Sequence, residues 1–212
     1  MINLKGLIIF GFGGHARSVA DVALAGGIKE LIFVDVNGHE GETFLGHPVL
    51  RNLPSKIDVN WACMPASGDG KKRQSQMEQI ENLNWPIVTL IAPSATIGVG
   101  AVISSGSFIG HHAHVGPMAI VGKSCIVNTG AVVEHDCIVG DYSHLSVNST
   151  VAGRSQIGKY VLVGAGATVI DGIKISDNVI IGAGGVVVKS INISGTYVGI
   201  PVKLVNGSLG IN

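Results

Sequence analysis

The sequence predicts a parallel β-helix built from six-residue repeats, preceded by a short α/β unit of the Rossmann-like type. Three observations predict this arrangement. An aliphatic residue recurs every six positions from Ile91 to Ile193, a second column of mostly small residues lies four positions further along each repeat, and residues 1–88 follow a strand–turn–helix–strand pattern instead. We therefore expect two domains, covering residues 1–88 and 89–212.

The composition favours stacked thin layers over a broad core. Of the 212 residues, 31 are glycine, 46% are hydrophobic and only 5% are aromatic. Charged residues make up 13% and balance to a formal net charge of zero, so binding to nucleic acid or to an anionic membrane has no bulk electrostatic support. We see no apolar run long enough for a bilayer, no signal peptide and no zinc-type cysteine spacing. We therefore expect a cytoplasmic protein without membrane insertion, whose three cysteines are free, buried thiols.

A period of six fits neither an α-helix nor a flat sheet. It fits a coil of three short strands, in which the aliphatic column points inward and the small column fills the remaining axial space. The glycine that often follows the aliphatic residue is expected to permit a turn with φ > 0. One repeat cannot bury its own apolar face, so the coils must stack into a solenoid.

Residues 1–88 contain a β-α-β unit, with strands expected at 7–10 and 31–34 and a helix at 16–25. A second helix is expected from Gln74 to Leu83. A turn with the sequence Gly-Phe-Gly-Gly-His joins the first strand to the first helix, and its backbone N–H groups suit a phosphate. Asp35 closes the second strand and is placed to bind a ribose or a base edge. Two alternatives stay open: NAD binding, although the third glycine of that motif is missing, and glycines that only permit tight helix–strand packing.

The segment Glu134-His135-Asp136 carries the most specific chemical signal. Histidine titrates in the range of a general base, and a neighbouring carboxylate can hold its tautomer. Three repeats make one coil, so Gly153 should lie directly above His135, at about 4.8 Å. It would leave room for a substrate and offer an N–H to a developing oxyanion. His144 falls on another face, and would join this site only across an interface or along a cofactor. The alternative is that His135 is a surface turn residue.

Three further histidines, His111, His112 and His114, lie close together in the sequence. They would suit a metal, and a carbonic anhydrase-like β-helix would need three such ligands across an interface. No carboxylate recurs beside them, and their spacing does not match. We therefore expect surface or inter-subunit histidines and no metal site.

Together these motifs resemble the hexapeptide-repeat sugar acetyltransferases of the sialic acid, bacillosamine and perosamine branches, over nearly the whole chain. The run from Val133 to Arg154 is most similar to the bacillosamine branch, the UDP-4-amino-sugar N-acetyltransferases. The resemblance implies a left-handed β-helix, acetyl-CoA as cosubstrate, and a homotrimer with active sites between subunits. It also implies a sugar-nucleotide-binding first domain and an acetyltransferase second domain.

The resemblance assigns roles to individual residues. His135 would be the base, and Asp136 would raise its basicity. The residues implied in acetyl-CoA binding are His144, Gly153, Ala165 and Ala183. The residues implied in sugar-nucleotide binding are Gly13, Gly14, His15, Asp35 and Gly68, the last followed five positions later by Arg73 as in the family.

The implied reaction is direct N-acetylation of the 4-amino group of a UDP-linked 4-amino-4,6-dideoxy sugar, in bacterial glycan biosynthesis. The alternatives are a GDP-perosamine N-acetyltransferase and a sialic acid O-acetyltransferase, which would use the same base and cosubstrate. A remote alternative is a non-catalytic β-helix scaffold that binds a nucleotide sugar. The stacked positions of His135 and Gly153 argue against it, because a scaffold needs neither residue.

Overall fold

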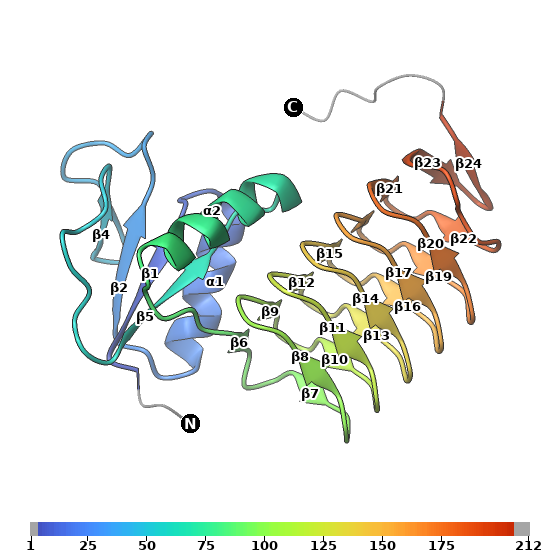
Figure 1. The fold of residues 1–212 in the computed structure, drawn as a ribbon, viewed down its shortest axis with the longest axis horizontal. Coiled ribbons are helices and arrows are strands. Elements are labelled where there is room, and N and C mark those ends of the chain that lie inside the picture. The colour runs from blue at the N-terminus through green and yellow to red at the C-terminus, as the bar shows by residue number, and fades with distance from the viewer. Residues whose placement is uncertain (1–3, 206–212) are drawn as a thin grey trace.

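The computed structural model describes residues 4–205, which form an α/β unit beside a long parallel β-helix (Figure 1). The two expected domains also include residues 1–3 and 206–212, which lie outside the described residues. Within 4–205, no helix combines the length and the apolar character needed to cross a bilayer. The three cysteines, Cys63, Cys125 and Cys137, are free and buried, as expected.

The α/β unit is a five-stranded sheet with strand order β3-β4-β2-β1-β5, parallel except for β3. Alternate residues of β1 enter two different cores, Leu7 and Ile9 with α1, and Ile8 and Phe10 with Ile80 of α2. The elements are β1 (Gly6–Phe10), α1 (Gly14–Ala25), β2 (Glu30–Val34), β3 (Thr43–Phe44), β4 (His47–Leu50), β5 (Trp61–Pro65) and α2 (Gly70–Asn82).

Helix α2 begins four residues before the expected start at Gln74. The Asp69 side chain accepts the backbone N–H of Lys72 at 2.8 Å, which satisfies one of the unpaired donors of the first turn. The prediction followed the apolar spacing and missed this cap, because the first turn of the helix is polar.

The β-helix consists of two- and three-residue strands in three parallel sheets, followed by a C-terminal hairpin. Paired residues lie one coil of eighteen apart, as Val133 and Val151 do, which confirms the three-strand coil. The strands are β6 (Leu90–Ile91), β7 (Thr96–Ile97), β8 (Val102–Ile103), β9 (Phe108–Ile109), β10 (His114–Val115), β11 (Ile120–Val121), β12 (Ile126–Val127), β13 (Val132–Val133), β14 (Ile138–Val139), β15 (His144–Leu145), β16 (Thr150–Val151), β17 (Gln156–Ile157), β18 (Leu162–Val163), β19 (Thr168–Val169), β20 (Lys174–Ile175), β21 (Val179–Ile181), β22 (Val186–Val187), β23 (Gly195–Gly199) and β24 (Val202–Leu204).

The glycines that follow the aliphatic column do not adopt the positive φ that the sequence analysis expected of them. Gly116, Gly140 and Gly164 are not among the residues with positive φ. A Cβ on Gly140 would lie 2.6 Å from the backbone carbon of Gly158 in the next coil. The positive φ falls two positions later, and often on another residue type, as at Asp136 with φ 58°. Close approach of stacked coils, and not a left-handed backbone, therefore requires these glycines.

The α/β unit packs against one sheet of the β-helix, the sheet that contains β6, β9, β12 and β15. Phe108 and Ile126 project from this sheet and are buried in the same core as Ala16 and Val19 of α1. On a second sheet, the outward residues Val102, Ile120 and Ile138 are exposed, so the described part of the α/β unit does not cover them. This asymmetry decides which residues of the β-helix can meet the glycine-rich turn of the same chain.

Candidate active site

His135 and Asp136 occupy the turn between β13 and β14, which belong to the two sheets other than the one packed against the α/β unit. The Nδ1 atom of His135 lies 2.9 Å from the Oδ2 atom of Asp136, and the His135 side chain is 44% exposed. When Nδ1–H donates to this carboxylate, the neutral ring presents an unprotonated Nε2. The corner therefore holds a histidine in the tautomer that a general base requires.

The next coil places Gly153 against this ring. The backbone N–H of Arg154 donates to the carbonyl of His135 at 2.9 Å, which is the stacking that the eighteen-residue coil predicts. A Cβ at position 153 would lie 2.5 Å from His135 Nε2. The imidazole thus fills the space that we expected to be left for a substrate. Among residues 4–205 the amide N–H of Gly153 has no hydrogen-bond partner, so the residue packed against Nε2 of His135 keeps a free backbone donor.

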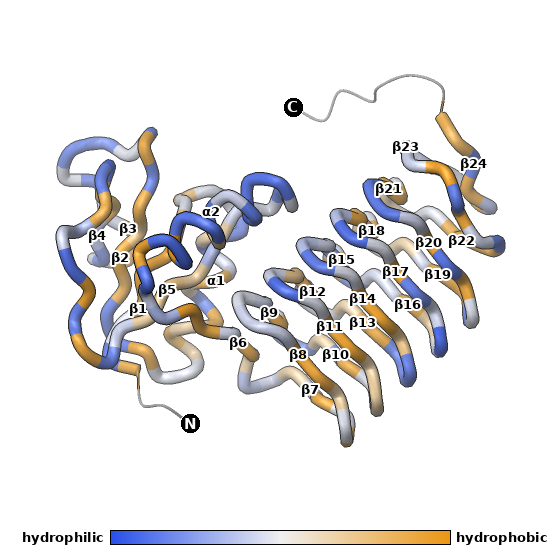
Figure 2. Tube along the Cα trace, in the orientation of Figure 1, coloured by the Kyte–Doolittle hydropathy of each residue, from blue (hydrophilic) through white to orange (hydrophobic). Residues whose placement is uncertain are grey.

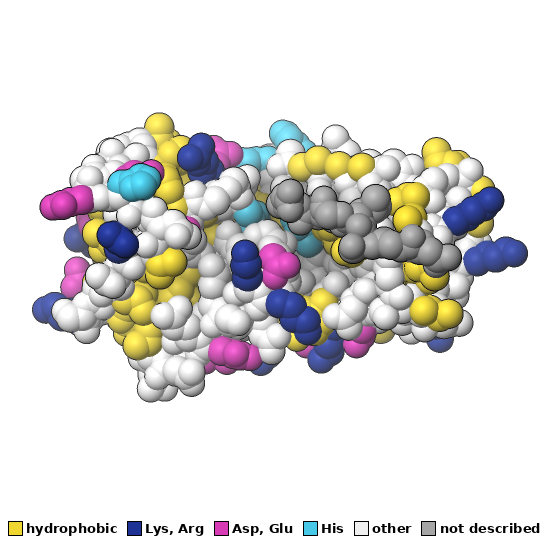
Figure 3. All heavy atoms as spheres, turned by 90° about the horizontal axis from the view of Figure 1, so that it is seen from above, with side chains coloured by type: hydrophobic (Ala, Val, Ile, Leu, Met, Phe, Trp, Pro, Cys, Tyr) yellow, Lys and Arg dark blue, Asp and Glu magenta, His cyan; other side chains and the backbone are white. Residues whose placement is uncertain are grey.

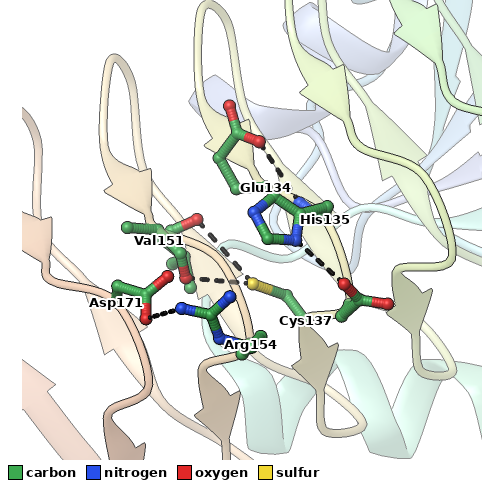
Figure 4. A network of polar contacts seen from close by, with 8 residues as sticks. Glu134, His135, Cys137, Val151, Arg154 and Asp171 are labelled. Carbon is green, nitrogen blue, oxygen red and sulfur yellow. Dashed lines mark hydrogen bonds and ion pairs between the residues drawn. The ribbon is translucent and has the colours of Figure 1, made fainter.

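An ion pair between Arg154 and Asp171, which the sequence analysis missed, lies at the same corner. Arg154 Nη2 donates to Asp171 Oδ1 at 2.6 Å (Figure 4). The other carboxylate oxygen of Asp171 would lie 3.1 Å from a Cβ at Gly153. Asp171 lies one coil of eighteen residues beyond Gly153. Applying the same eighteen-residue period once more to the sequence would therefore have found it.

His144 lies on β15, in the sheet that faces the α/β unit. Its Nδ1 atom is 3.3 Å from the carbonyl oxygen of Gly68, and its Nε2 atom is 3.2 Å from Nδ2 of Asn128. The ring centroid is 6.2 Å from that of His15. Within one chain, the structure therefore groups His144 with Gly68 and His15 and separates it from His135.

The imidazole of His15 is buried at this junction. Neither ring nitrogen has a hydrogen-bond partner among the described residues, and the ring stands edge-on to Phe108, with centroids 4.9 Å apart. Burial, with smaller contributions from the neighbouring His144 and Arg73, lowers the pKa of His15 to about 3. Burial and then the charge of Arg73 lower the pKa of His144 to about 4. Both rings are therefore neutral near pH 7.

The glycine-rich turn is open on its outer side. Gly13 caps α1 and Gly14 begins it, and a Cβ at either position would meet nothing within 4 Å. The Asp35 carboxylate accepts the backbone N–H groups of Phe12 and Asn37, both at 2.9 Å. Tight packing therefore does not require these two glycines. A cavity of about 230 Å³ lies beside them, lined by Phe12, Gly13, Asp35, Asn37, Gly38, His39 and Glu42.

Ala165 and Ala183 stack on adjacent coils, since Gly184 N–H donates to the Ala165 carbonyl at 2.8 Å. They follow β18 and β21, which belong to the same sheet as β15, and they form one edge of that sheet, three positions beyond Leu162, the strand residue that pairs with His144. The next residue in each case is a glycine with positive φ, Gly166 or Gly184, where a Cβ would meet nothing within 4 Å. This edge is open, and it is separate from the corner that holds Gly153.

His111 takes part in a contact between the α/β unit and the first coils. Its Nδ1 atom lies 2.8 Å from Ser94 Oγ, and its Nε2 atom lies 3.3 Å from Asp21 Oδ2 of α1. Within residues 4–205, no three His, Cys, Asp or Glu side chains are grouped so that they could hold a metal ion.

Comparisons with known proteins agree with the fold described above. Residues 6–80 match a family described as the PglD N-terminal domain. The acetyltransferase domain of PglB from Neisseria gonorrhoeae is 30% identical, with a TM-score of 0.88 over 95% of this chain and 100% of that chain. PerB from Caulobacter crescentus, solved with CoA and GDP-perosamine, is 30% identical, with a TM-score of 0.83 over 95% of this chain and 97% of that chain.

The chain belongs to the hexapeptide-repeat sugar N-acetyltransferases. It is therefore an acyltransferase, and the predicted α/β subdomain followed by a left-handed parallel β-helix is confirmed. WeeI from Acinetobacter baumannii, at 18% identity and a TM-score of 0.62, shares the fold. In the chain described here, histidine side chains lie close together where the α/β unit meets the β-helix (Figure 3).

Proposed function

We propose that this acyltransferase moves the acetyl group of acetyl-CoA to the 4-amino group of a UDP-linked 4-amino-4,6-dideoxy sugar, in the cytoplasm and in bacterial glycan biosynthesis. The observation that carries the proposal is the His135–Asp136 pair beside the free amide of Gly153. The PglB domain has been solved with acetyl coenzyme A, and PerB with CoA and GDP-perosamine, which supports acetyl-CoA and a nucleotide-linked amino sugar as the substrate classes.

The corner contains the groups that direct transfer to an amine needs. The amine nitrogen attacks the thioester carbonyl and an N–C bond forms, while Nε2 of His135 takes the amine proton. Asp136 stabilises the imidazolium, and the N–H of Gly153 donates to the tetrahedral oxyanion. The C–S bond then breaks, and the leaving thiolate receives the proton from His135. A neutral amine attacks unaided, whereas a hydroxyl demands more from a single histidine.

The first domain, residues 1–88, would hold the sugar nucleotide. Gly13, Gly14 and His15 would meet the diphosphate, because the start of α1 presents backbone N–H groups on an open face. Asp35 lies at the adjacent cavity, where it would meet the uridine end. Its carboxylate accepts two backbone N–H groups and keeps further lone pairs for a ligand.

The second domain, residues 89–212, would assemble as a homotrimer with its active sites between subunits. Val102, Ile120 and Ile138 form one row on the sheet next to the His135 corner, and they are 54%, 44% and 43% exposed. Their strands β8, β11 and β14 are hydrophobic segments of the trace (Figure 2). An exposed aliphatic row of this kind is typical of an interface between copies. A neighbouring copy seated there would bring its own edge of acetyl-CoA-binding residues to His135.

The match to PerB favours GDP-perosamine as a second candidate, since it offers a comparable amine on a different nucleotide. The test is thiol release from acetyl-CoA with UDP-, GDP- and CMP-linked sugars as acceptors. We expect the highest kcat/KM with a UDP-linked 4-amino sugar. Preference for the GDP sugar would establish the second candidate, and preference for a sialic acid hydroxyl would overturn N-acetylation.

A further inference from the structure

Arg73 of α2 connects the α/β unit to the β-helix through a buried guanidinium, and the residue is only 1% exposed. All five of its N–H groups donate to backbone carbonyl oxygens. The acceptors lie at 2.6 to 3.2 Å and belong to Ser67, Gly68, Ser124, Tyr142 and Ser143. Two of them are in the loop after β5, and three are in two stacked turns of the β-helix.

A buried cation is costly unless its donors are paired, and here five charge-assisted hydrogen bonds pair them. Burial lowers the pKa of Arg73 to about 10, so the side chain stays charged near neutral pH. Lysine could not replace it, because an ammonium is a compact point charge with three donors and cannot span the loop and two turns at once.

His144 lies next to this contact, and its neighbours define its tautomer from both sides. Asn128 Oδ1 accepts the N–H of Thr129 at 2.8 Å, which leaves the Nδ2 amide facing His144 Nε2 at 3.2 Å. An amide nitrogen only donates, so Nε2 must be unprotonated. The Gly68 carbonyl only accepts, so Nδ1, at 3.3 Å, must carry the proton. Gly68 requires a proton on Nδ1 and Asn128 excludes one on Nε2, so together they select the neutral Nδ1–H ring.

One carbonyl, that of Gly68, accepts from both Arg73 and His144. We propose that Arg73 is a positioning residue, which holds the Gly68 carbonyl against His144 and thereby fixes the neutral Nδ1–H tautomer of that ring. The charged and titratable groups that face His144 are Arg73 on α2 and His15 on α1, and the charge of Arg73 disfavours a proton on the ring. His144 is then a neutral hydrogen-bonding ring, and proton transfer falls to His135. Only the assignment of His144 to the acetyl-CoA site rests on the proposed function.

The tautomer can be read directly by ¹⁵N NMR of the histidine-labelled full chain without substrates, with the His144 signal assigned by its loss in His144→Gln. We expect wild-type His144 as Nδ1–H, without titration, from pH 5.5 to 8. In Arg73→Lys and Arg73→Met we expect a population with Nε2–H, because the Gly68 carbonyl is released. Lys72→Met, an exposed neighbour on the same helix, should leave the signal unchanged. A wild-type Nε2–H ring, or an unaltered Nδ1–H ring in a folded Arg73 variant, would overturn the proposal.

Asn128→Asp tests the same ring even if the Arg73 variants do not fold. A carboxylate oxygen in place of the Nδ2 amide would accept from Nε2–H, so the pKa of His144 should rise by about 1–3 units. An unchanged His144 titration would show that these neighbours do not control the ring and would overturn the proposal. None of these spectra requires turnover. An inactive wild-type enzyme would therefore contradict the proposed function and leave the tautomer result standing.

Discussion

His135 and His144 carry the same side chain in two environments, and the environments separate their chemistry. His135 is partly exposed, beside a carboxylate and a free amide. His144 is enclosed between a carbonyl and an amide nitrogen, and burial and the charge of Arg73 lower its pKa to about 4. A base that accepts and returns a proton near pH 7 needs the first environment.

Replacing the proposed base should affect turnover and leave the fold intact. We expect His135→Ala to lower kcat by at least ~10²-fold, the lower end for the loss of a general base. Folding should be unaffected, because the side chain projects from a turn and supports no core. Steady-state kinetics with acetyl-CoA and the preferred sugar nucleotide measure the effect, and His112→Asn at an equivalent turn is the control. Turnover equal to that of the wild type would remove His135 from the mechanism.

The glycine-rich turn offers a second test at the residue scale. A side chain at Gly13 meets nothing in the protein, so Gly13→Val should fold and instead occupy the space proposed for the diphosphate. We expect the KM for the sugar nucleotide to rise roughly tenfold, equivalent to about 1.4 kcal/mol. The KM for acetyl-CoA should stay nearly constant. If both constants rose equally, the nucleotide site would lie elsewhere.

At the scale of the elements, the glycine after each aliphatic residue sets how closely two coils approach. Gly140→Ala would force a Cβ to within 2.6 Å of the Gly158 backbone, and the coils cannot separate locally without breaking the ladder. We expect the free energy of unfolding to fall by about 1–3 kcal/mol, as for overpacked cores. Gly172→Asn is the matched control, since φ is +69° and the space is open, and asparagine tolerates that conformation. Denaturant unfolding that ranked the two variants in the opposite order would contradict this account.

The elements also show where sequence reasoning succeeds and where it stops. In a solenoid, contacts recur at a fixed offset, so the period was enough to place Gly153 against His135. The contacts around His144 do not follow that offset, because Asn128 is 16 residues away and Gly68 is 76 residues away. They depend on how the α/β unit docks against the β-helix. No pattern in the sequence encodes that docking, so the role of Arg73 and the enclosure of His15 became visible only in three dimensions.

At the scale of the whole molecule, the two half-buried histidines make the junction between the α/β unit and the β-helix sensitive to acid. Their pKa values in the folded protein, about 3 for His15 and about 4 for His144, lie below the ordinary value of 6.5. The unfolded chain therefore binds more protons below pH 6.5. The stability that neutral rings contribute is present above that pH and is lost progressively as the pH falls toward 4. The loss amounts to up to about 1.4 kcal/mol per pH unit for each ring.

The measurement is the free energy of unfolding of the wild type and of His15→Phe between pH 7 and 5. Phenylalanine suits the apolar contact with Phe108 and cannot take up a proton. We expect a shallower decline in the variant than in the wild type. Parallel declines would mean that His15 is not held neutral in the folded state.

The separation of His135 from His144 within one chain leads to a test of the complete assembly. If each active site combines the His135 corner of one copy with the His144 edge of its neighbour, His135→Ala and His144→Ala inactivate different halves of a site. Co-refolding or co-expressing the two variants should then restore activity, since some interfaces pair an intact corner with an intact edge. Random mixing in equal amounts in a cyclic trimer would restore about one quarter of the wild-type sites. Sites built from single chains would restore none, because every chain would carry one lesion, and size-exclusion chromatography with light scattering would show whether mixed trimers had formed.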